Sequence, residues 1–431
     1  MQRLFFVNRY FAPDHSATSQ LLTQLVVHLA QSGRAVHVVT SRQLYDDAGA
    51  ELPGSDEREG VQIHRVTGSR FGRARMASRA IDYLSFYASA RQVLLKMVRP
   101  SDIVVTMTDP PLLSILGAHI GHRTGARTIN WLQDVYPEIA AELGVPLVKS
   151  PFGASLRTRR DLSLRSADAN VVVGSCMAER LAGFGVAAEQ IHTVPNWCND
   201  ESIRPLPSRS NPLRKKWKLE GKFVVGYSGN LGRAHEFETL LAAAERLKSD
   251  PNIVFLFIGG GHYMRALEQR VKEAGLSSQF RFLPYQEDGL LPFSLSVPDV
   301  HWISLRPELD GLVVPSKVYG IAAAGRPFIS VSSPSGEVAR LATRFGSGFV
   351  VAPGHSAELA RVIWRLAGDS EEVEAIGVRA RAMIDRHYAR RHALGRWVRV
   401  IEKVEQTAEP DISGLLESTL AAESTRGRLH A

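Results

Sequence analysis

The residues whose types and spacing could do chemistry gather in a glycine-rich turn, GYSGNLGRAHEFETLL, at residues 226–241. The turn contains three glycines, Gly226, Gly229 and Gly232. Glycines allow a tight turn and a close approach of the backbone to an anion, and a helix expected to begin near Ala234 would direct free N–H groups at that anion. Asn230 lies in the turn, and Arg233 and His235 follow it. The pattern predicts a phosphate cradle, although a plain turn between strand and helix has the same glycines.

A second candidate lies at the start of another predicted helix, in the sequence Pro315-Ser316-Lys317. Proline suits the first helical turn, and Ser316 could satisfy free N–H groups there. Lys317 places a cation in that turn, where it opposes the helix dipole and costs stability unless an anion is bound. We therefore interpret Lys317 as a diphosphate ligand, with a solvated surface lysine as the alternative.

Two more predicted strands of the second half end in residues that suit a binding site. Gly261 closes the run Gly259-Gly260-Gly261, which permits a close backbone approach or simply a tight turn. Pro284 and Tyr285 lie in FLPYQ, where a strand with a half-buried tyrosine is the ordinary interpretation from the residues alone.

Polar side chains also follow predicted strands in the first half of the chain. The loop 9–19 should lie at the carboxyl edge of a sheet, where ligands bind. Its candidate contacts for an acceptor or a phosphate are Asp14, His15 and Ser16. Asp134 follows the strand RTINWLQ and should face the same cleft, unless it only caps the next helix. We interpret Asp109, at a further strand end, as structural.

Composition narrows the class of protein. A chain of 431 residues with 44% hydrophobic residues is too long for one core and suits two domains. The net charge of +8 favours anionic partners such as phosphates or an anionic membrane face, without choosing among them. The two cysteines, Cys176 and Cys198, have neither CxxC nor metal-ligand spacing, which indicates a reducing compartment and argues against a zinc site.

The sequence predicts neither export nor metal chemistry. The N-terminus opens into a strand, MQRLFFVNRYF, without a cleavage signature, and no window approaches the roughly 18–20 apolar residues of a spanning helix. We therefore expect a cytoplasmic protein that is at most peripheral on the inner face of the membrane. There is no Asp-x-Asp triplet, and His235-Glu236 does not continue to HExxH because Thr239 stands where the second histidine is required. We expect no metal and no cofactor.

Strands and helices alternate along the chain. The expected strands are 4–8, 35–40, 103–108, 128–132, 170–173, 223–227, 253–258, 280–283, 301–305 and 328–331. The expected helices are 19–31, 79–97, 112–122, 177–184, 237–248, 263–274, 317–324 and 337–345. Strict alternation predicts an α/β fold with two doubly wound, Rossmann-like parallel sheets facing a cleft. The Pro/Ser/Asn-rich loop 194–212 divides the expected domains, 1–200 and 201–404, and the polar segment 405–431 is expected to be a disordered tail.

The order of several motifs resembles the retaining glycosyltransferases of family four. The motifs are the glycine turn, FLFIGGG, FLPYQ and PSKVYGIAAAGRP in the second half, with NRYFAPDHSATSQ and LQDVYPE in the first. The resemblance covers nearly the full chain and is greatest to a bacterial branch acting in O-antigen and capsule assembly, including L-fucosamine transferases. It implies a GT-B fold, with an acceptor-binding first domain and a second domain that binds a nucleotide-sugar.

The resemblance also implies roles for single residues. Pro284 and Tyr285 would line the slot for the nucleotide base, and Asp134 would orient the incoming hydroxyl or steady positive charge at the sugar carbon. We count His15 with Asp134, Arg233 and Lys317 as candidate catalytic residues. Without a metal, the leaving diphosphate would be neutralised by glycine-loop N–H groups and by Arg233, His235 and Lys317.

One departure from the family pattern concerns the ribose. The family usually places a ribose-binding glutamate five residues before the glycine of the AxGxP segment, and here that position is Gly320. If a two-residue insertion is allowed, Asp310-Gly311-Leu312 takes the place of the upstream glutamate motif, and Asp310 would contact sugar hydroxyls. Glu337 could replace the ribose ligand, or it could be an ordinary carboxylate in the first turn of a helix.

The function implied by the resemblance is transfer of a sugar, with retention, from a nucleotide-diphosphate donor, UDP-linked in our expectation. The acceptor would be a glycan or a polyprenyl-diphosphate-linked sugar in bacterial surface polysaccharide assembly, and we expect no nucleic-acid partner. No covalent nucleophile is assigned. Two alternatives remain: a nucleotide-sugar epimerase of the same fold, and a non-catalytic GT-B binding subunit, which Gly320 motivates. A dinucleotide oxidoreductase is disfavoured because no GxGxxG follows the first strand.

Two arginine clusters in the first half predict a docking face for an anionic membrane surface. They are Arg70, Arg73, Arg75 and Arg79, and Arg157, Arg159, Arg160 and Arg165. A solvated basic face is the usual meaning of such runs. The lipid-linked acceptor implied by the resemblance favours docking.

Overall fold

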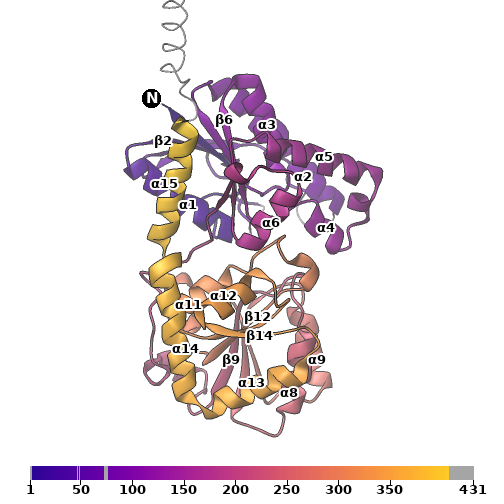
Figure 1. The fold of residues 1–431 in the computed structure, drawn as a ribbon, viewed down its shortest axis with the longest axis vertical. Helices are drawn as coiled ribbons and strands as arrows, with labels where there is room; N and C mark the ends of the chain where they lie inside the picture. Colours follow the sequence, from indigo (N-terminus) through magenta and orange to yellow (C-terminus); the bar gives the residue numbers. More distant parts are fainter. Residues whose placement is uncertain (1, 46, 48, 72–75, 407–431) are drawn as a thin grey trace, which may run out of the picture.

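A computed structural model describes residues 2–45, 47, 49–71 and 76–406 of the chain. These residues form two α/β domains that lie one above the other along the long axis of the molecule (Figure 1). Each domain is built around one predominantly parallel sheet with helices on both faces. The prediction of two doubly wound, Rossmann-like sheets is confirmed.

The first domain holds an eight-stranded sheet in the order β3-β4-β2-β1-β5-β6-β7-β8, in which only the β3–β4 pair is antiparallel. Its strands are β1 (Arg3–Val7), β2 (Ala35–Ser41), β3 (Ser55–Arg58), β4 (Val61–Val66), β5 (Ile103–Thr106), β6 (Arg127–Leu132), β7 (Ala169–Val172) and β8 (Ile191–Thr193). The strand order changes direction between β1 and β5. Ligands of such sheets bind outside the carboxyl ends of the strands at this point.

Helices cover both faces of this sheet. They are α1 (Ala17–Gln31), α2 (Met76–Met97), α3 (Leu113–Thr124), α4 (Glu138–Glu142), α5 (Pro151–Arg165) and α6 (Ser175–Gly183). Leucines of α1 pack with one set of strand side chains, and α2 and α3 pack with the alternate set, as expected for period-two strands buried on both faces. In Figure 1, α6 lies on the side of the first domain that faces the second domain.

The second domain has an all-parallel, six-stranded sheet in the order β11-β10-β9-β12-β13-β14. Its strands are β9 (Phe223–Asn230), β10 (Ile253–Gly260), β11 (Phe280–Leu283), β12 (Val300–Ser304), β13 (Phe328–Val331) and β14 (Gly348–Val351). Its helices are α7 (Pro212–Lys216), α8 (Glu238–Arg246), α9 (Met264–Glu273), α10 (Leu291–Leu295), α11 (Lys317–Ala323), α12 (Glu337–Phe345), α13 (Ser356–Gly368) and α14 (Ser370–Met383). Here the strand order changes direction between β9 and β12.

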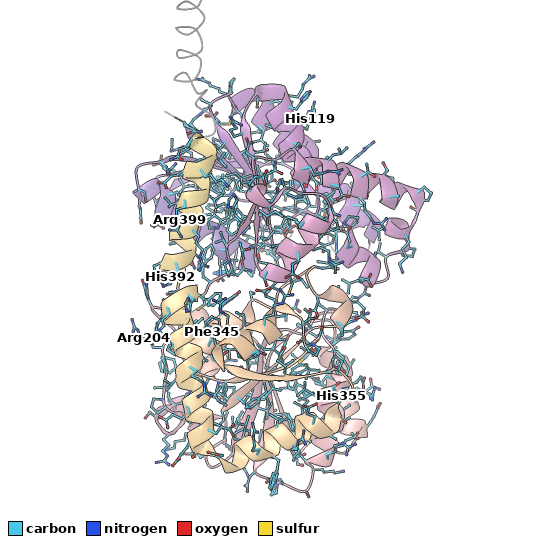
Figure 2. All side chains as sticks on the ribbon, in the orientation of Figure 1. His119, Arg204, Phe345, His355, His392 and Arg399 are labelled. Atoms are coloured by element: carbon cyan, nitrogen blue, oxygen red, sulfur yellow. The ribbon has the colours of Figure 1, made fainter. Side chains whose placement is uncertain are left out.

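The last helix, α15 (Arg390–Gln406), returns to the first domain (Figure 1). His392 and Arg399 mark its course in Figure 2, and its buried residue Trp397 packs edge-on against Trp131 of β6 at a centroid distance of 4.7 Å. The predicted second domain, 201–404, therefore includes a helix that belongs to the first core. Truncation of such a buried tryptophan to alanine costs about 3–5 kcal/mol of stability.

The structure also corrects the predicted start of the tail. Glu405 and Gln406 belong to α15, and Glu405 pairs with Arg34 of the first domain. A side chain that is held in an ion pair on a helix is not part of a disordered segment. The rest of the predicted tail, 407–431, lies outside the described residues.

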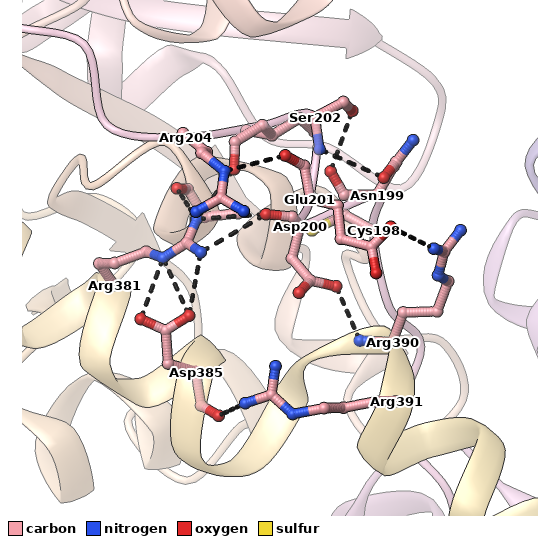
Figure 3. A network of polar contacts seen from close by, with 12 residues as sticks. Cys198, Asn199, Asp200, Glu201, Ser202, Arg204, Arg381, Asp385, Arg390 and Arg391 are labelled. Carbon is pink, nitrogen blue, oxygen red and sulfur yellow. Dashed lines mark hydrogen bonds and ion pairs between the residues drawn. The ribbon is translucent and has the colours of Figure 1, made fainter.

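The chain crosses between the domains twice, and the crossings are tied to each other (Figure 3). One crossing is the loop 194–212, and the other follows α14 through a π-helical turn, Ile384–Tyr388. Arg381 donates hydrogen bonds to the backbone carbonyls of Ile203 and Ala323, at 2.8 and 2.9 Å. The Asp200 carboxylate accepts from the backbone N–H of Arg390 at 2.8 Å, at the start of α15. The two crossings of the chain are thus clamped to each other in one region.

Candidate active site

A cleft of about 940 Å³ lies between the carboxyl edges of the two sheets. The first domain lines it with residues that include His15, Asp109 and Asp134, and the second domain with Asn230 and Tyr285. The structure therefore brings sequence-predicted site residues of both domains to one cavity from opposite sides. This is the position in which doubly wound domains bind ligands.

The glycine turn is shaped by packing of two loops. Pairing of β9 with β10 continues to the last residue of each strand, so that Asn230 lies opposite Gly260. Gly229 and Gly261 have φ angles of +124° and +125°, and a Cβ built on Gly261 would lie 2.4 Å from Asn230 Oδ1. Leu231 donates its N–H to the Gly260 carbonyl at 2.7 Å. Backbone conformation and close packing thus account for both glycines without any ligand.

The helix after this turn begins later than predicted. Helix α8 starts at Glu238 rather than near Ala234. The Glu236 carboxylate accepts a hydrogen bond from the backbone N–H of Thr239 at 2.7 Å and so caps the helix. The Glu236 carboxylate therefore takes one of the free N–H groups at this helix end. The start near Ala234 was wrong, whereas the expected range 237–248 begins one residue from the observed start.

Lys317 lies beside the glycine turn. Its Nζ donates to Tyr227 Oη at 2.6 Å and lies 3.9 Å from the centroid of that tyrosine ring. A Cβ built on Gly229 would lie 3.8 Å from Nζ. No ion pair joins this ammonium to a carboxylate among the described residues. Burial without a counter-ion lowers the pKa of Lys317 to about 7.

His235 holds the turn in place. Its Nδ1 lies 2.7 Å from the Ser304 carbonyl and its Nε2 lies 3.0 Å from the Asn230 carbonyl. Burial, and then the charge of Lys317, lowers the pKa of His235 to about 4. Both ring nitrogens face protein carbonyls, so this imidazole connects the ends of β9 and β12. Only a protonated ring could donate to both carbonyls, and burial opposes that form.

The other predicted second-domain residues near the turn lie at its rim. Arg233 is exposed, and its Nε contacts the His262 ring at 3.4 Å. Tyr285 is 61% exposed, and its ring edge would lie 3.3 Å from a Cβ on Gly260. Pro284, which precedes Tyr285, is exposed. In the glycine turn, a Cβ built on Gly232 would lie 3.5 Å from Asn230 Nδ2.

Ser316 does not have the role predicted from the sequence. It is exposed and precedes α11 with φ −63° and ψ −16°, and its side chain makes no capping hydrogen bond. The N-cap conformation in which a serine oxygen reaches the first N–H groups is extended, whereas Ser316 is already helical. The prediction that Ser316 satisfies these groups was wrong.

The first-domain side of the cleft carries acid groups. Asp134 is partly buried, and its burial, followed by the charge of Asp109, raises the pKa of Asp134 to about 7. Asp109 lines the same cleft, so the expectation that it is only structural misses its electrostatic effect on Asp134. The backbone after Asp134 contacts the second domain, because Val135 donates its N–H to the Leu312 carbonyl at 2.9 Å.

The loop after β1 is held by Asp14. The Asp14 carboxylate accepts from the backbone N–H groups of Ser16, at 2.8 Å, and of Tyr45. Ser16 lies at the N-cap position of α1, and its side chain makes no capping hydrogen bond. His15 is exposed on the cleft wall. Of this trio, Asp14 orders the loop and His15 faces the cavity.

Three predicted donor-binding residues lie instead against α6 of the first domain. Glu337 accepts from Ser175 Oγ and from the backbone N–H of Cys176, both at 2.9 Å, and so caps α6. A Cβ on Gly311 would lie 2.9 Å from the Cys176 carbonyl. Asp310 accepts from Arg180 through its backbone carbonyl, and burial raises the pKa of its carboxyl group. In this structure Asp310, Gly311 and Glu337 join the domains.

Several residues in and beside the cleft could not be recognised from the sequence. Tyr227 lies inside a predicted strand and has the pattern of a core residue. Arg79 was assigned to a membrane face, although it lines the cleft with Tyr83 and Tyr136. Position gave a signal only for Tyr227 and Tyr136, which lie within a few residues of the ends of β9 and β6, whereas Arg79 and Tyr83 lie on α2, far from the strand ends on either side.

Neither a metal centre nor a membrane span is found in the described part of the chain. Among residues 2–406, apart from the gaps given above, no three histidine, cysteine or acidic side chains gather as metal ligands would. No helix in the part of the chain that the structure describes is long and apolar enough to cross a bilayer.

Comparison with known proteins agrees with this architecture. Residues 17–197 match the model of the glycosyl transferase 4-like domain, and residues 210–383 match that of glycosyl transferases group 1. The chain is 25% identical over 394 residues to WbjE of Pseudomonas aeruginosa, named as a probable glycosyltransferase, which covers 90% of this chain and 95% of WbjE. It is 28% identical over 267 residues to WcaI of Escherichia coli K12, whose name assigns it to colanic acid biosynthesis. This match covers 61% of this chain and 64% of WcaI.

Solved structures are similar at the level of the fold. Sucrose-phosphate synthase from Thermosynechococcus elongatus superimposes with a TM-score of 0.77 and 16% identity, covering 95% of this chain and all of that chain. Anabaena HepE in complex with UDP-glucose gives a TM-score of 0.67 and 16% identity, and the match covers 94% of this chain and all of the HepE chain.

The fold and the matched domains define a two-domain glycosyltransferase with the GT-B architecture. Within that class, the matched domains and the named relatives place the chain among the glycosyltransferases of family four.

Proposed function

We propose that the protein is a retaining glycosyltransferase that takes a sugar from a UDP-linked donor and transfers it to a glycan or lipid-linked acceptor in bacterial surface polysaccharide assembly. The names of WbjE and WcaI support the reaction class, and the complex of HepE with UDP-glucose supports the donor. The acceptor is the lipid-linked or free glycan that such assembly uses. The location that fits this role is the cytoplasm, at the inner face of the membrane.

The single observation that carries this proposal is the uncompensated cation of Lys317 beside the glycine turn, next to the cleft residue Asn230. The Lys317 ammonium lies beside the turn at Gly229, is partly buried, and donates its hydrogen bond to a neutral hydroxyl. A desolvated cation is unfavourable in the empty protein and becomes favourable when an anion binds. A diphosphate that gains charge as the sugar leaves is the anion that this position would stabilise most.

The opposite wall supplies acid groups to the acceptor. With its pKa near neutrality, Asp134 can exchange a proton or accept a hydrogen bond from an acceptor hydroxyl. His15 lies on the same wall and can orient the acceptor. Sugar transfer then proceeds between a cationic donor side and an acidic acceptor side, without a metal or a covalent nucleophile in the scheme.

A panel of UDP-, GDP-, ADP- and dTDP-sugars, each incubated with the protein and simple glycoside acceptors, tests this function. The proposal expects release of the nucleoside diphosphate and a glycosylated product whose anomeric configuration matches that of the donor. Conversion of the donor to an epimer without any acceptor would establish the epimerase alternative. Tight binding of a donor without turnover would establish the binding-subunit alternative.

Membrane docking is the finer part of the proposal. Helices α2 and α5 expose apolar side chains, namely Ile81, Leu84, Phe152 and Leu162, at 48–68% exposure. The same helices carry exposed cations that include Arg91 and Arg159. The acidic residues of these helices, Asp82 and Asp161, are paired with arginines. A basic and apolar face suits an anionic bilayer, at about 1 kcal/mol for each cation near the surface.

The predicted docking cations need correction. Arg160 has a side chain only 3% exposed and pairs with Glu138 at 2.6 Å, so it cannot reach a bilayer. Arg70 pairs with Glu51 at 2.9 Å. Two further predicted cations, Arg73 and Arg75, lie outside the described residues.

Vesicle sedimentation tests the docking face. We expect salt-sensitive binding to vesicles that contain phosphatidylglycerol, and at least a severalfold loss of binding in the double variant Phe152→Ser/Arg159→Glu. The matched control is Arg361→Glu, an exposed charge reversal on α13 of the second domain. Equal binding by the double variant and the control would refute this face.

A further inference from the structure

Tyr227 is a buried tyrosine whose hydroxyl group both donates and accepts a hydrogen bond. It lies in β9 with 1% of its surface exposed. Its Oη donates to the Asn230 carbonyl at 2.7 Å and accepts from Lys317 Nζ at 2.6 Å. A phenol has one proton to donate, so donation to the carbonyl leaves its lone pairs for the ammonium. The directions of the two hydrogen bonds are therefore fixed by the partners.

The ring of Tyr227 cannot move away from Lys317. It stacks on Phe257 at a centroid distance of 5.5 Å and touches Trp302 at 5.5 Å on neighbouring strands. His235 packs edge-on against it at 5.8 Å. The ammonium also lies 3.9 Å from the ring centroid, within range of a cation–π interaction. The tyrosine thus holds the ammonium by its hydroxyl and by its ring.

The choice of a neutral partner has a functional consequence. A carboxylate in this place would neutralise the lysine and weaken its attraction for an anion. The hydroxyl holds the ammonium in position but leaves its charge uncompensated. Burial raises the pKa of the Tyr227 phenol well above its usual range, so the partner stays neutral.

We propose that Tyr227 is the positioning residue that fixes Lys317 at the end of β9, beside the turn at Gly229, so that the full charge of the ammonium meets a bound diphosphate. This inference rests on the proposed function, because it assumes that Lys317 binds that anion. Tyr227 acts through Lys317 and through the Asn230 carbonyl, and it does not itself contact the reacting atoms.

A double-mutant cycle with Tyr227→Phe and Lys317→Met tests the proposal. Phenylalanine keeps the ring and its packing and removes only the hydroxyl. The ligand is whichever of UDP, GDP, ADP and dTDP binds the wild-type protein most tightly by calorimetry, and the corresponding nucleoside serves as a probe without phosphates. The matched control is Tyr263→Phe, a tyrosine of the same domain that packs on Phe237.

We expect Tyr227→Phe to weaken diphosphate binding roughly tenfold, the scale of one hydrogen bond to a charged group, and to leave nucleoside binding unchanged. In the Lys317→Met background the same change should have no further effect on the diphosphate, because the group that Tyr227 positions is already gone. Tyr263→Phe should bind both ligands as the wild type does.

The outcomes separate this inference from the proposed function. Equal losses on Tyr227→Phe in both backgrounds, or an equal loss for the nucleoside, would give Tyr227 a merely structural role and overturn the inference alone. Unchanged diphosphate affinity in Lys317→Met would remove the donor site itself, and with it the proposed function. Absence of binding by all four diphosphates would do the same.

Discussion

Burial shifts the pKa of one ionisable group in each domain, and the two shifts have opposite directions. On the first-domain wall, burial raises the pKa of Asp134 to about 7. In the second domain, beside the glycine turn, burial lowers the pKa of Lys317 to about 7. An acid and a base that differ by several units in water are thus brought to the same range by desolvation.

The two ionisable groups differ in the charge of their nearest partner. Asp134 has a second carboxylate nearby, Asp109, which opposes its ionisation. Lys317 is held by the neutral Tyr227 hydroxyl and ring. The acidic wall is therefore suited to a neutral, proton-bearing ligand such as a sugar hydroxyl, and the cationic wall to an anion. This asymmetry is the basis of our proposal that the donor diphosphate binds the second domain and the acceptor the first.

The largest expected effect comes from the cation. Lys317→Met should lower transfer turnover by roughly 10²-fold or more, because the leaving diphosphate loses a preorganised positive charge. Steady-state kinetics with the intact donor measures this loss. Arg233→Ala is the comparison variant, since that arginine is exposed at the rim and contacts His262. A larger loss in Arg233→Ala than in Lys317→Met would reverse the assignment.

The second-largest effect should come from removal of the Asp134 carboxyl group. Asp134→Asn should lower turnover by about 10²-fold if the carboxyl group takes part in proton transfer, and it should leave the affinity for a nucleoside diphosphate unchanged. Kinetics gives the first quantity and calorimetry the second. Weaker diphosphate binding in this variant would show that the two walls do not divide the ligands as described.

The walls should also give opposite pH dependences of stability. The raised pKa of Asp134 stabilises the fold at low pH, and this contribution is lost as the pH rises from about 4 to about 7. The lowered pKa of Lys317 stabilises it only at high pH, and this contribution is lost as the pH falls from about 10 to about 7.

Thermal unfolding of the ligand-free protein across this range tests the pair. Asp134→Asn should remove the decline in stability between about pH 4 and pH 7, and Lys317→Met should remove the rise between about pH 7 and pH 10. Variants whose profiles keep both slopes would show that other groups dominate each range.

The smallest expected effect concerns Gly320, which stands where the family has a ribose-binding glutamate. A Cβ at this half-buried position would lie 3.5 Å from Leu295, an ordinary contact. Gly320→Ala should therefore add about 0.5–1 kcal/mol of stability to α11 and leave diphosphate binding intact. Denaturant unfolding and calorimetry measure the two quantities. A loss of diphosphate affinity would indicate that the nucleotide itself occupies the space beside Gly320.

The sequence predicted the fold better than the site. Period-two apolar runs indicated most strands, and helix α12 (Glu337–Phe345) begins and ends at the predicted residues. The strand β3 (Ser55–Arg58) was missed because it is exposed throughout and has no apolar residue. Helix α5 was missed because Arg157, Arg159 and Arg160 interrupt its apolar pattern, although Arg160 is buried by an ion pair.

The site residues that could not be predicted from the sequence share one physical feature: their contacts join parts of the chain that are far apart in sequence. The glycine turn and Lys317 were visible because residue type and position in a local motif pointed to an anion. The contacts of Glu337 and Asp310 with α6 were not visible, since they depend on how the two domains meet. Tyr227 was hidden for the same reason: a tyrosine within a strand has the same sequence pattern whether or not its hydroxyl meets a lysine far along the chain.

The central claim is that an uncompensated ammonium holds the donor diphosphate. The most direct test is calorimetric titration of UDP into the wild type and Lys317→Met at pH 7 and at pH 9. We predict that wild-type affinity falls about tenfold or more at pH 9, as Lys317 loses its proton, and that the variant binds weakly at both pH values. Tight binding by Lys317→Met, or the same pH dependence in both proteins, would contradict the claim.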